Sequence, residues 1–158
     1  MRQARACSQV TLATTAGSVP SGYSCAVPIE TTRMIDPPGL FRSPRYANIV
    51  VAGGFAFIAG QTGFDPDGNV VGVGDIKAQC EKTLQNLSIA LRAVNAEPKD
   101  IVKVTNYVTD RAYLATLVEV RNRVWGELRT ASTAVVGGLA RDTLMVEVDA
   151  IVYLGKDA

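Results

Sequence analysis

The strongest structural signal in the chain lies in residues 75–108, which read DIKAQCEKTLQNLSIALRAVNAEPKDIVKVTNYV. Apolar side chains recur there at steps of three and four residues, the period of one helix face; they are Ile76, Cys80, Leu84, Leu87, Leu91 and Val94. Gly74 or Asp75 is the expected cap at the start of this helix, and Pro98 follows its end. Residues 101–108 are rich in β-branched side chains, which is typical of a strand. The stretch therefore predicts an amphipathic helix over 75–96 followed directly by a strand.

The residues before this helix predict a β-hairpin and a turn. Two short apolar runs, at 49–51 and 55–59, flank Gly53-Gly54, a pair that suits a tight turn between strands. Residues 65–68 read Asp-Pro-Asp-Gly, a strong turn sequence. Further upstream, residues 34–48 contain three prolines, which predict turns and extended chain in place of a helix.

A second helix and two more strands are expected after residue 108. Asp110 is the expected N-cap of the helix, whose inner face comprises Leu114, Leu117, Val118, Arg121, Val124, Trp125 and Leu128. Arg121 is the one charge on this face. Strands are expected near 133–136 and 144–154, and in the second of these apolar residues alternate with Glu147 and its neighbours.

The predicted order of elements is ββ-α-β-α-ββ, an α+β sandwich in which two helices lie on one face of a mixed, mostly antiparallel sheet. Two helices cover only one face of such a sheet. If the other face is apolar, a partner must cover it, because large exposed apolar patches are rare on monomers. This arrangement predicts an oligomer.

Composition excludes several classes of function. The chain has 158 residues, and its 16 basic and 15 acidic residues give a net charge of +1, which offers no general attraction to nucleic acid or a membrane. No apolar run reaches the ~18 residues of a transmembrane helix. Histidine is absent, which removes the Ser-His-Asp triad, Cys-His nucleophiles and His-ligated zinc.

The three cysteines, Cys7, Cys25 and Cys80, are scattered and form no C-x-x-C motif. They predict neither a disulfide framework nor a zinc site, so the default location is the reducing cytoplasm. Cys80 lies on the apolar helix stripe and is expected in the core.

Residues 1–33 differ in character from the rest of the chain. They are rich in Ser and Thr, contain Arg2 and Arg5, and have no acid before Glu30. We expect a flexible N-terminal extension here, followed by one domain over 34–158. An organelle transit peptide and upstream sequence ahead of a start at Met34 are the alternatives.

Several separated motifs, in order, make the chain similar to the Rid family, also called YjgF or L-PSP. They are Ile58-Ala59-Gly60-Gln61, the turn at 65–68, the helix end at 94–96, residues 100–105, and the closing segments 132–140 and 146–150. The resemblance implies a chorismate-mutase-like fold and a homotrimer whose sheets form a barrel-like core. It also implies pockets for small molecules between subunits, hydrolysis of enamines and imines such as 2-aminoacrylate, and no metal or cofactor.

The resemblance also implies site residues. Tyr46 stands fourteen positions before Gly60, as the family's pocket tyrosine does before the glycine whose backbone lines the pocket. Glu147 matches the acid that holds water or polarises the substrate nitrogen. Taken from strand alternation alone, Glu147 would be an ordinary solvent-facing side chain.

The chain departs from the family pattern where the substrate carboxylate is held. The family arginine falls at Ser132, and a small residue that is often cysteine falls at Ala134. On the second helix, Val118 replaces a frequent asparagine and Arg121 replaces an aromatic residue. A serine cannot form the bidentate pair of an arginine; Arg129 or Arg121 could supply a guanidinium from a different direction.

Three functions follow from these observations. The first is a Rid-like hydrolytic deaminase of altered specificity, with Glu147 and Tyr46 as catalytic residues and with Gly60, Ser132, Arg121 and Arg129 as substrate-binding residues. The second is a non-catalytic trimer that binds a small metabolite in the same cleft. The third, a ribonuclease, is disfavoured by the charge balance.

Overall fold

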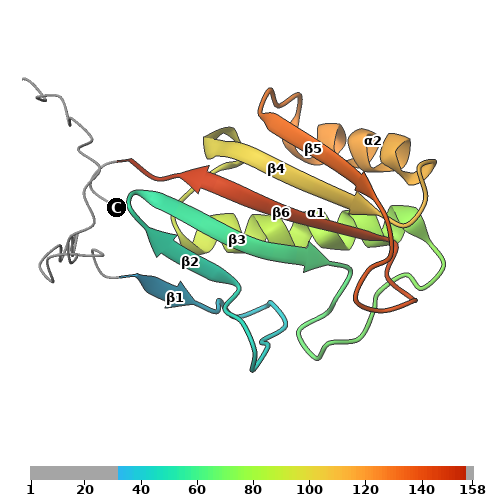
Figure 1. Ribbon diagram of the computed structural model, residues 1–158, viewed down its shortest axis with the longest axis horizontal. Coiled ribbons are helices and arrows are strands. Elements are labelled where there is room, and N and C mark those ends of the chain that lie inside the picture. Colours follow the sequence, from blue (N-terminus) through green and yellow to red (C-terminus); the bar gives the residue numbers. More distant parts are fainter. Residues whose placement is uncertain (1–31, 156–158) are drawn as a thin grey trace, which may run out of the picture.

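Six strands form one mixed sheet, and two helices cover one of its faces (Figure 1). The computed structural model describes residues 32–155. In chain order the elements are β1 (Arg33–Ile35), β2 (Ile49–Ala52), β3 (Phe55–Thr62), α1 (Ile76–Ala93), a 3₁₀ turn (Pro98–Asp100), β4 (Ile101–Val108), α2 (Tyr113–Trp125), β5 (Ala131–Val136) and β6 (Val146–Tyr153). The strand order is β1-β2-β3-β6-β4-β5, with β4 and β5 parallel and every other pair antiparallel. The predicted α+β sandwich is confirmed.

The glycine pair between β2 and β3 forms the predicted hairpin turn. Gly53 and Gly54 have φ angles of 57° and 77°, the left-handed region that two-residue hairpin turns require and that glycine enters without strain. The hairpin lies beside β6, which joins it to β4 at the centre of the sheet (Figure 1).

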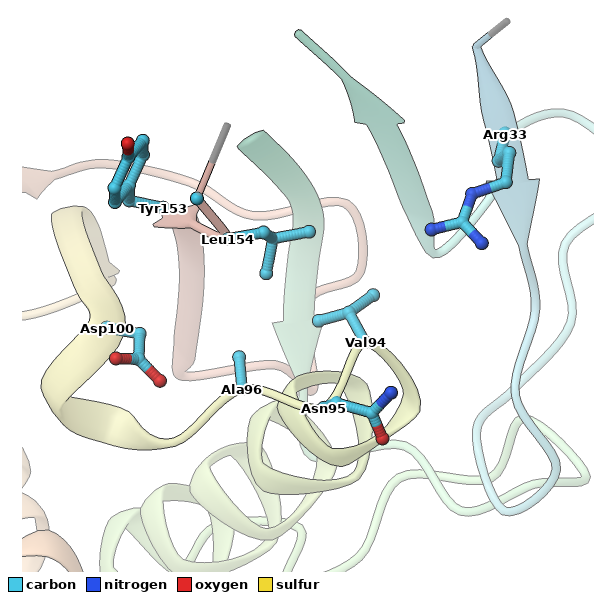
Figure 2. Close-up of a pocket in the computed structure, with 8 residues that line it drawn as sticks. Arg33, Val94, Asn95, Ala96, Asp100, Tyr153 and Leu154 are labelled. Atoms are coloured by element: carbon cyan, nitrogen blue, oxygen red, sulfur yellow. The ribbon is translucent and has the colours of Figure 1, made fainter. Parts of the chain in front are cut away.

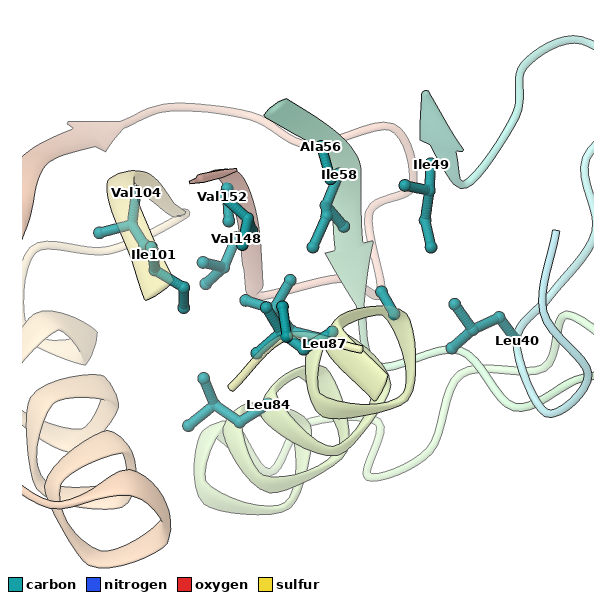
Figure 3. Packing of buried hydrophobic residues seen from close by; sticks show 14 of the residues in the cluster. Leu40, Ile49, Ala56, Ile58, Leu84, Leu87, Ile101, Val104, Val148 and Val152 are labelled. Atoms are coloured by element: carbon teal, nitrogen blue, oxygen red, sulfur yellow. The ribbon is translucent and has the colours of Figure 1, made fainter. Parts of the chain in front are cut away.

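Helix α1 supplies most of the side chains that pack against the inner face of the sheet. The Asp75 side chain accepts hydrogen bonds from the backbone N–H groups of Lys77 (2.9 Å) and Ala78 (3.1 Å), which fixes the start of the helix. Four residues of the predicted stripe are fully buried: Cys80, Leu84, Leu87 and Leu91. Figure 3 shows Leu84 and Leu87 beneath β-strand residues such as Ile58 and Val148.

Cys80 is a core residue, as expected. Burial, with smaller contributions from the charges of Glu81 and Asp75, raises the pKa of its thiol to about 12. The thiolate is therefore scarce near neutral pH, and Cys80 is a poor nucleophile. Cys7 and Cys25 lie outside the described residues.

Two predicted details are wrong. Asp110 is not the N-cap of α2, because its carboxylate accepts the N–H of Ala112 (2.8 Å) and closes a turn before the helix. The inner face of α2 is also rotated from the prediction: Leu117 and Val120 are buried, whereas Val118 and Val124 are exposed. The three-residue strand β1 is an addition, since no strand was expected before residue 49.

The expected N-terminal extension lies almost wholly outside the described residues, which begin at residue 32. Arg33 already pairs with Val51 in the sheet. Within residues 32–155, no helix combines the length and apolar character needed to cross a bilayer, and no cluster of acidic and cysteine side chains could hold a metal ion.

The sheet face that carries no helix is apolar over β1, β2, β3 and the end of β6. We call this surface the apolar strip; cross-strand partners place Met34, Val50, Phe57, Ile151 and Tyr153 on it. Met34 is 75% exposed, Phe57 45% and Tyr153 44%. An apolar face without a cover is the condition under which the sequence predicts an oligomer.

Candidate functional site

A hollow of about 260 Å³ opens where β3 ends and β6 begins. We call it the Glu147 hollow; its lining residues are Tyr46, Ala59, Gly60, Thr62, Phe64, Ala140, Leu144 and Glu147. Tyr46, Gly60 and Glu147, all expected in one pocket, thus lie together. They come from the loop before β2, the end of β3 and the start of β6.

Among the described residues that line this hollow, Glu147 is the only one with a carboxyl group. Burial, with a smaller contribution from the charge of Asp149 two residues along the same strand face, raises the pKa of its carboxyl above the usual 4.5. Within residues 32–155 the carboxylate accepts no hydrogen bond and faces no cation at ion-pair distance. A carboxyl with these surroundings takes up and releases a proton nearer neutral pH than an ordinary glutamate does.

Gly60 allows the Glu147 side chain to lie directly over the backbone of β3. A Cβ atom at position 60 would overlap the Oε1 atom of Glu147 and lie 2.6 Å from its Cδ. The pairing of β3 with β6 shifts register between Ile58 and Gln61, so a bulge brings the Gly60 backbone into the hollow. Glycine at this position is therefore a steric requirement of the acid beside it.

Buried amides hold the loop that carries Tyr46. Asn48 is 4% exposed; its backbone N–H and its Nδ2 both donate to Asp36 Oδ1 (2.8 and 3.2 Å), and Nδ2 also donates to the carbonyl of Phe41 (3.0 Å). Gln61 Nε2 donates to the carbonyl of Ala59 (3.0 Å) and reaches Asn48 Oδ1 (3.4 Å). These bonds fix the chain on both sides of the hollow.

A polar stripe on α1 holds the other loops around the hollow, and the sequence analysis missed it. Asn86 Nδ2 donates to the carbonyls of Thr62 (3.0 Å) and Phe64 (2.8 Å). Gln79 Nε2 donates to the carbonyl of Thr143 (2.8 Å), and Gln79 Oε1 accepts the N–H of Met145 (2.9 Å). Both side chains are buried. Gln79 and Asn86 are seven residues apart, a spacing that puts them on the same face of the helix, and this was the signal available in the sequence.

A second hollow, also about 260 Å³, lies between α2 and β5. We call it the Ser132 hollow; it is lined by Asn106, Leu114, Leu117, Val118, Arg121, Leu128, Thr130, Ser132 and Ala134. Asn106 was not foreseen; its Nδ2 donates to Ser132 Oγ (3.1 Å) and to the carbonyl of Thr133 (3.0 Å). A polar residue between Val104 and Val108, both buried, was the sequence signal for it.

The two hollows lie on opposite faces of the sheet in one chain. Ser132 pairs with Val104, on the helix-covered face, whereas Glu147 pairs with Tyr107, on the open face. Arg121 lines the Ser132 hollow, but Arg129 is exposed and lines neither hollow. Within one protomer, the expected site residues are therefore divided between two separate hollows.

A third hollow, about 490 Å³, lies at the opposite end of β6 from Glu147. Arg33 and Asp100, its two charged residues, lie on opposite sides of it, with Leu154 and Val94 between them (Figure 2). It contains none of the expected site residues.

The chain belongs to the L-PSP family, also called Rid or YjgF, because the family model described as "Endoribonuclease L-PSP" matches residues 41–154. A RutC family protein of Pyrococcus abyssi is 37% identical over 109 residues, which cover 68% of this chain and 85% of the relative. A RutC family protein of Pyrococcus horikoshii is 38% identical over a stretch of the same length. The resemblance stated from the motifs is confirmed.

Solved structures agree with this assignment. A putative endoribonuclease of Thermotoga maritima has a TM-score of 0.71 and 30% identity, covering 78% of this chain and 98% of its own. RidA from an Antarctic Psychrobacter has a TM-score of 0.70 and 28% identity, covering 77% of this chain and 98% of its own. The fold expected from the resemblance is therefore that of its relatives.

Proposed function

We propose that this protein is a hydrolytic deaminase of a small enamine or imine and that it works as a homotrimer. In this proposal the Glu147 hollow of one protomer meets the Ser132 hollow of the next, so that each subunit interface forms one complete pocket. The main observation in support of this proposal is Glu147, an acid of raised pKa that lies over Gly60 in a small hollow. The family membership supports this class of chemistry.

Glu147 can both take and return the proton that imine hydrolysis requires. Its carboxylate accepts a proton from water as the water oxygen bonds to the imine carbon, and the electron pair of the C=N bond moves to nitrogen. Proton return to that nitrogen gives a carbinolamine. Glu147 then accepts the hydroxyl proton and passes it to the amino nitrogen, so that the C–N bond breaks, its electron pair leaves with ammonia, and a carbonyl remains. The glutamate ends as it began. A pKa above the usual range suits both transfers.

Tyr46 and Gly60 have supporting roles in this scheme. Tyr46 is half-exposed at the mouth of the Glu147 hollow, where its hydroxyl can donate a hydrogen bond to the substrate. The backbone of Gly60 approaches the reacting atoms because no side chain stands there.

Ser132 alters the specificity of the pocket. Ser132 and Ala134 are small, so this part of the β5 wall is open, and a serine holds a carboxylate less firmly than an arginine fork does. We therefore expect 2-aminoacrylate to be a poor substrate and a bulkier imine to fit better.

The test is turnover of imines generated in situ by an amino-acid oxidase, with ammonia release compared with the uncatalysed rate. Glu147→Gln keeps the shape of the side chain and removes the base, so turnover should fall by ~10²–10⁴-fold. Gln85→Ala, an exposed change on α1, is the matched control. Unchanged turnover in a folded Glu147→Gln protein would remove Glu147 from the mechanism.

A non-catalytic metabolite-binding trimer is the second candidate, and the observation that favours it is Ser132 in the place of the family arginine. Binding of a small carboxylate without acceleration of any tested imine would support this alternative. A ribonuclease, the activity that the family description names, is not favoured by a net charge of +1.

A further inference from the structure

Arg121 is a cation without a partner in the wall of the Ser132 hollow. It is half-buried on α2 and lines the hollow opposite β5. Its Nε atom is shielded from solvent and has no hydrogen-bond partner, and within residues 32–155 the guanidinium forms no ion pair. A buried donor left unpaired costs free energy, so the side chain is arranged to receive an acceptor from outside the chain.

Two hydroxyl groups of the hollow can donate hydrogen bonds beside Arg121. Thr130 Oγ1 is buried without a partner. Ser132 Oγ already accepts a hydrogen bond from Asn106 Nδ2 at 3.1 Å, which leaves its own proton free to donate. Arg121, Thr130 and Ser132 therefore offer donors to one space, and no acidic side chain lines it.

The remaining lining is apolar and limits what the donors can bind. Leucine side chains at 114, 117 and 128, together with Val118 and Ala134, form the rest of the wall. One positive charge matches a monoanion, and the planar guanidinium matches the two oxygens of a carboxylate. An apolar wall favours a carboxylate that carries a short hydrocarbon chain.

We propose that Arg121 is the specificity-determining residue of this pocket and binds the carboxylate of a 2-imino acid whose side chain is larger than that of 2-aminoacrylate. This inference rests on the proposed function, because it assumes that the Ser132 hollow meets Glu147 of the next protomer. The guanidinium comes from the helix wall instead of the strand, so the substrate lies deeper against β5, where Ser132 and Ala134 leave room.

The experiment is isothermal titration of the full-length protein with 2-oxopentanoate, the stable keto acid that corresponds to such an imine. We expect wild type to bind it, 2-oxopentanamide to bind at least about tenfold more weakly, and Arg121→Gln to weaken 2-oxopentanoate binding by roughly 10- to 100-fold. Arg121→Lys keeps the positive charge but loses the planar guanidinium, so its affinity for 2-oxopentanoate should lie between those of wild type and Arg121→Gln. Arg129→Gln, the same change at an exposed position outside the hollow, should leave the affinity unchanged.

Three results would overturn the proposal: no binding by wild type, equal affinities of wild type and Arg121→Gln, or a loss in Arg129→Gln instead. Tighter binding of inorganic phosphate than of 2-oxopentanoate would also overturn it. If Arg121→Gln does not fold, the Arg121→Lys variant tests the proposal instead. An affinity of this variant for 2-oxopentanoate equal to that of wild type would contradict bidentate binding by the guanidinium. Binding is measured without turnover, so failure here is distinct from unchanged activity in Glu147→Gln, which bears on deamination.

Discussion

At the scale of single residues, Glu147 and Gly60 are sterically coupled. The acid occupies space that any side chain at position 60 would fill, and the same crowding removes water from the carboxyl and contributes to its raised pKa. The position of the carboxyl and its proton affinity therefore have a common origin in the bulge of β3.

Gly60→Ala should displace the carboxylate of Glu147 without unfolding the protein, because the overlapping atoms are the far end of a flexible side chain. We expect turnover to fall by about 10- to 100-fold, since small misplacements of a catalytic group are costly. Gly137→Ala is the control: nothing lies within 4 Å of the added methyl group. Equal turnover in the two variants would contradict the steric account.

The pH dependence of stability should report the raised pKa of Glu147. The folded protein binds this proton more tightly than the unfolded chain, so stability falls as pH rises from 4.5 through the raised value, and the penalty is constant above it. Glu147→Gln removes the penalty. Urea unfolding should find the variant more stable than wild type at pH 7, with the gap closing below pH 4.5. A variant less stable than wild type at pH 7 would mean that the carboxylate is stabilised in the folded state.

At the scale of elements, α1 serves two purposes with two adjacent stripes. Its apolar stripe packs on the sheet, and its polar stripe, Gln79, Thr83 and Asn86, is equally buried. The amides of this polar stripe bind backbone groups of the loops on either side of Glu147. The helix therefore positions the Glu147 hollow as well as the core.

Asn86→Ala should cost about 1–3 kcal/mol of unfolding free energy for each carbonyl that it leaves unpaired in the interior, at Thr62 and Phe64. Urea unfolding measures this loss, and Gln85→Ala, which removes an exposed amide one residue away, is the control. The difference between the two variants gives the contribution of the buried amide to the free energy of unfolding. The control should lie within about 0.5 kcal/mol of wild type. Equal stabilities of both variants would mean that water replaces the lost bonds.

These elements show which features a single sequence predicts. The α1 stripe and the alternation in β6 were predicted, because burial imposes a period that survives in the residue pattern. The polar stripe was missed because Gln79 and Asn86 have the chemistry of a solvated face, and only their partners in distant loops make them interior residues. The start of α2 was misplaced because the Asp110 carboxylate closes a turn with the same chemistry as a cap.

The candidate site was predictable only in part. The family resemblance implied one pocket for Tyr46, Gly60 and Glu147, and the Glu147 hollow brings them together. The separation of Ser132 from Glu147 depends on strand register, and a shift of one residue would reverse the face on which each lies. Register is fixed by long-range pairing, which the local pattern does not encode. The choice between Arg121 and Arg129 likewise needed the position of α2 relative to β5.

At the scale of the whole molecule, the apolar strip and the division of the expected site residues between two hollows both bear on the proposed trimer. Exposed apolar residues such as Phe57 and Tyr153 favour burial against a second copy, and the expected site residues lie in two hollows that do not meet within one chain. A homotrimer in which the open sheet faces meet at the centre, as proposed from the family pattern, satisfies both conditions.

Phe57→Lys should therefore dissociate the protein, because it places a charge in the middle of the apolar strip, where Phe57 pairs with Val50 and Ile151. Sedimentation velocity at micromolar concentration should find a trimer for wild type and a monomer for the variant, with a helix and strand content unchanged by circular dichroism. Turnover should fall with dissociation even though Glu147 and Gly60 are untouched, because the monomer keeps only half of each pocket.

Val73→Lys separates this effect from the simple addition of a surface charge. Val73 is 64% exposed, more than Phe57, but it lies in the turn before α1 and not on the sheet. This variant should sediment as wild type does and keep its turnover. A wild-type monomer at micromolar concentration would refute the trimer. A Phe57→Lys monomer with full activity would show that the Glu147 hollow is sufficient for catalysis, and the shared pocket would then have to be abandoned while the fold and family assignment stand.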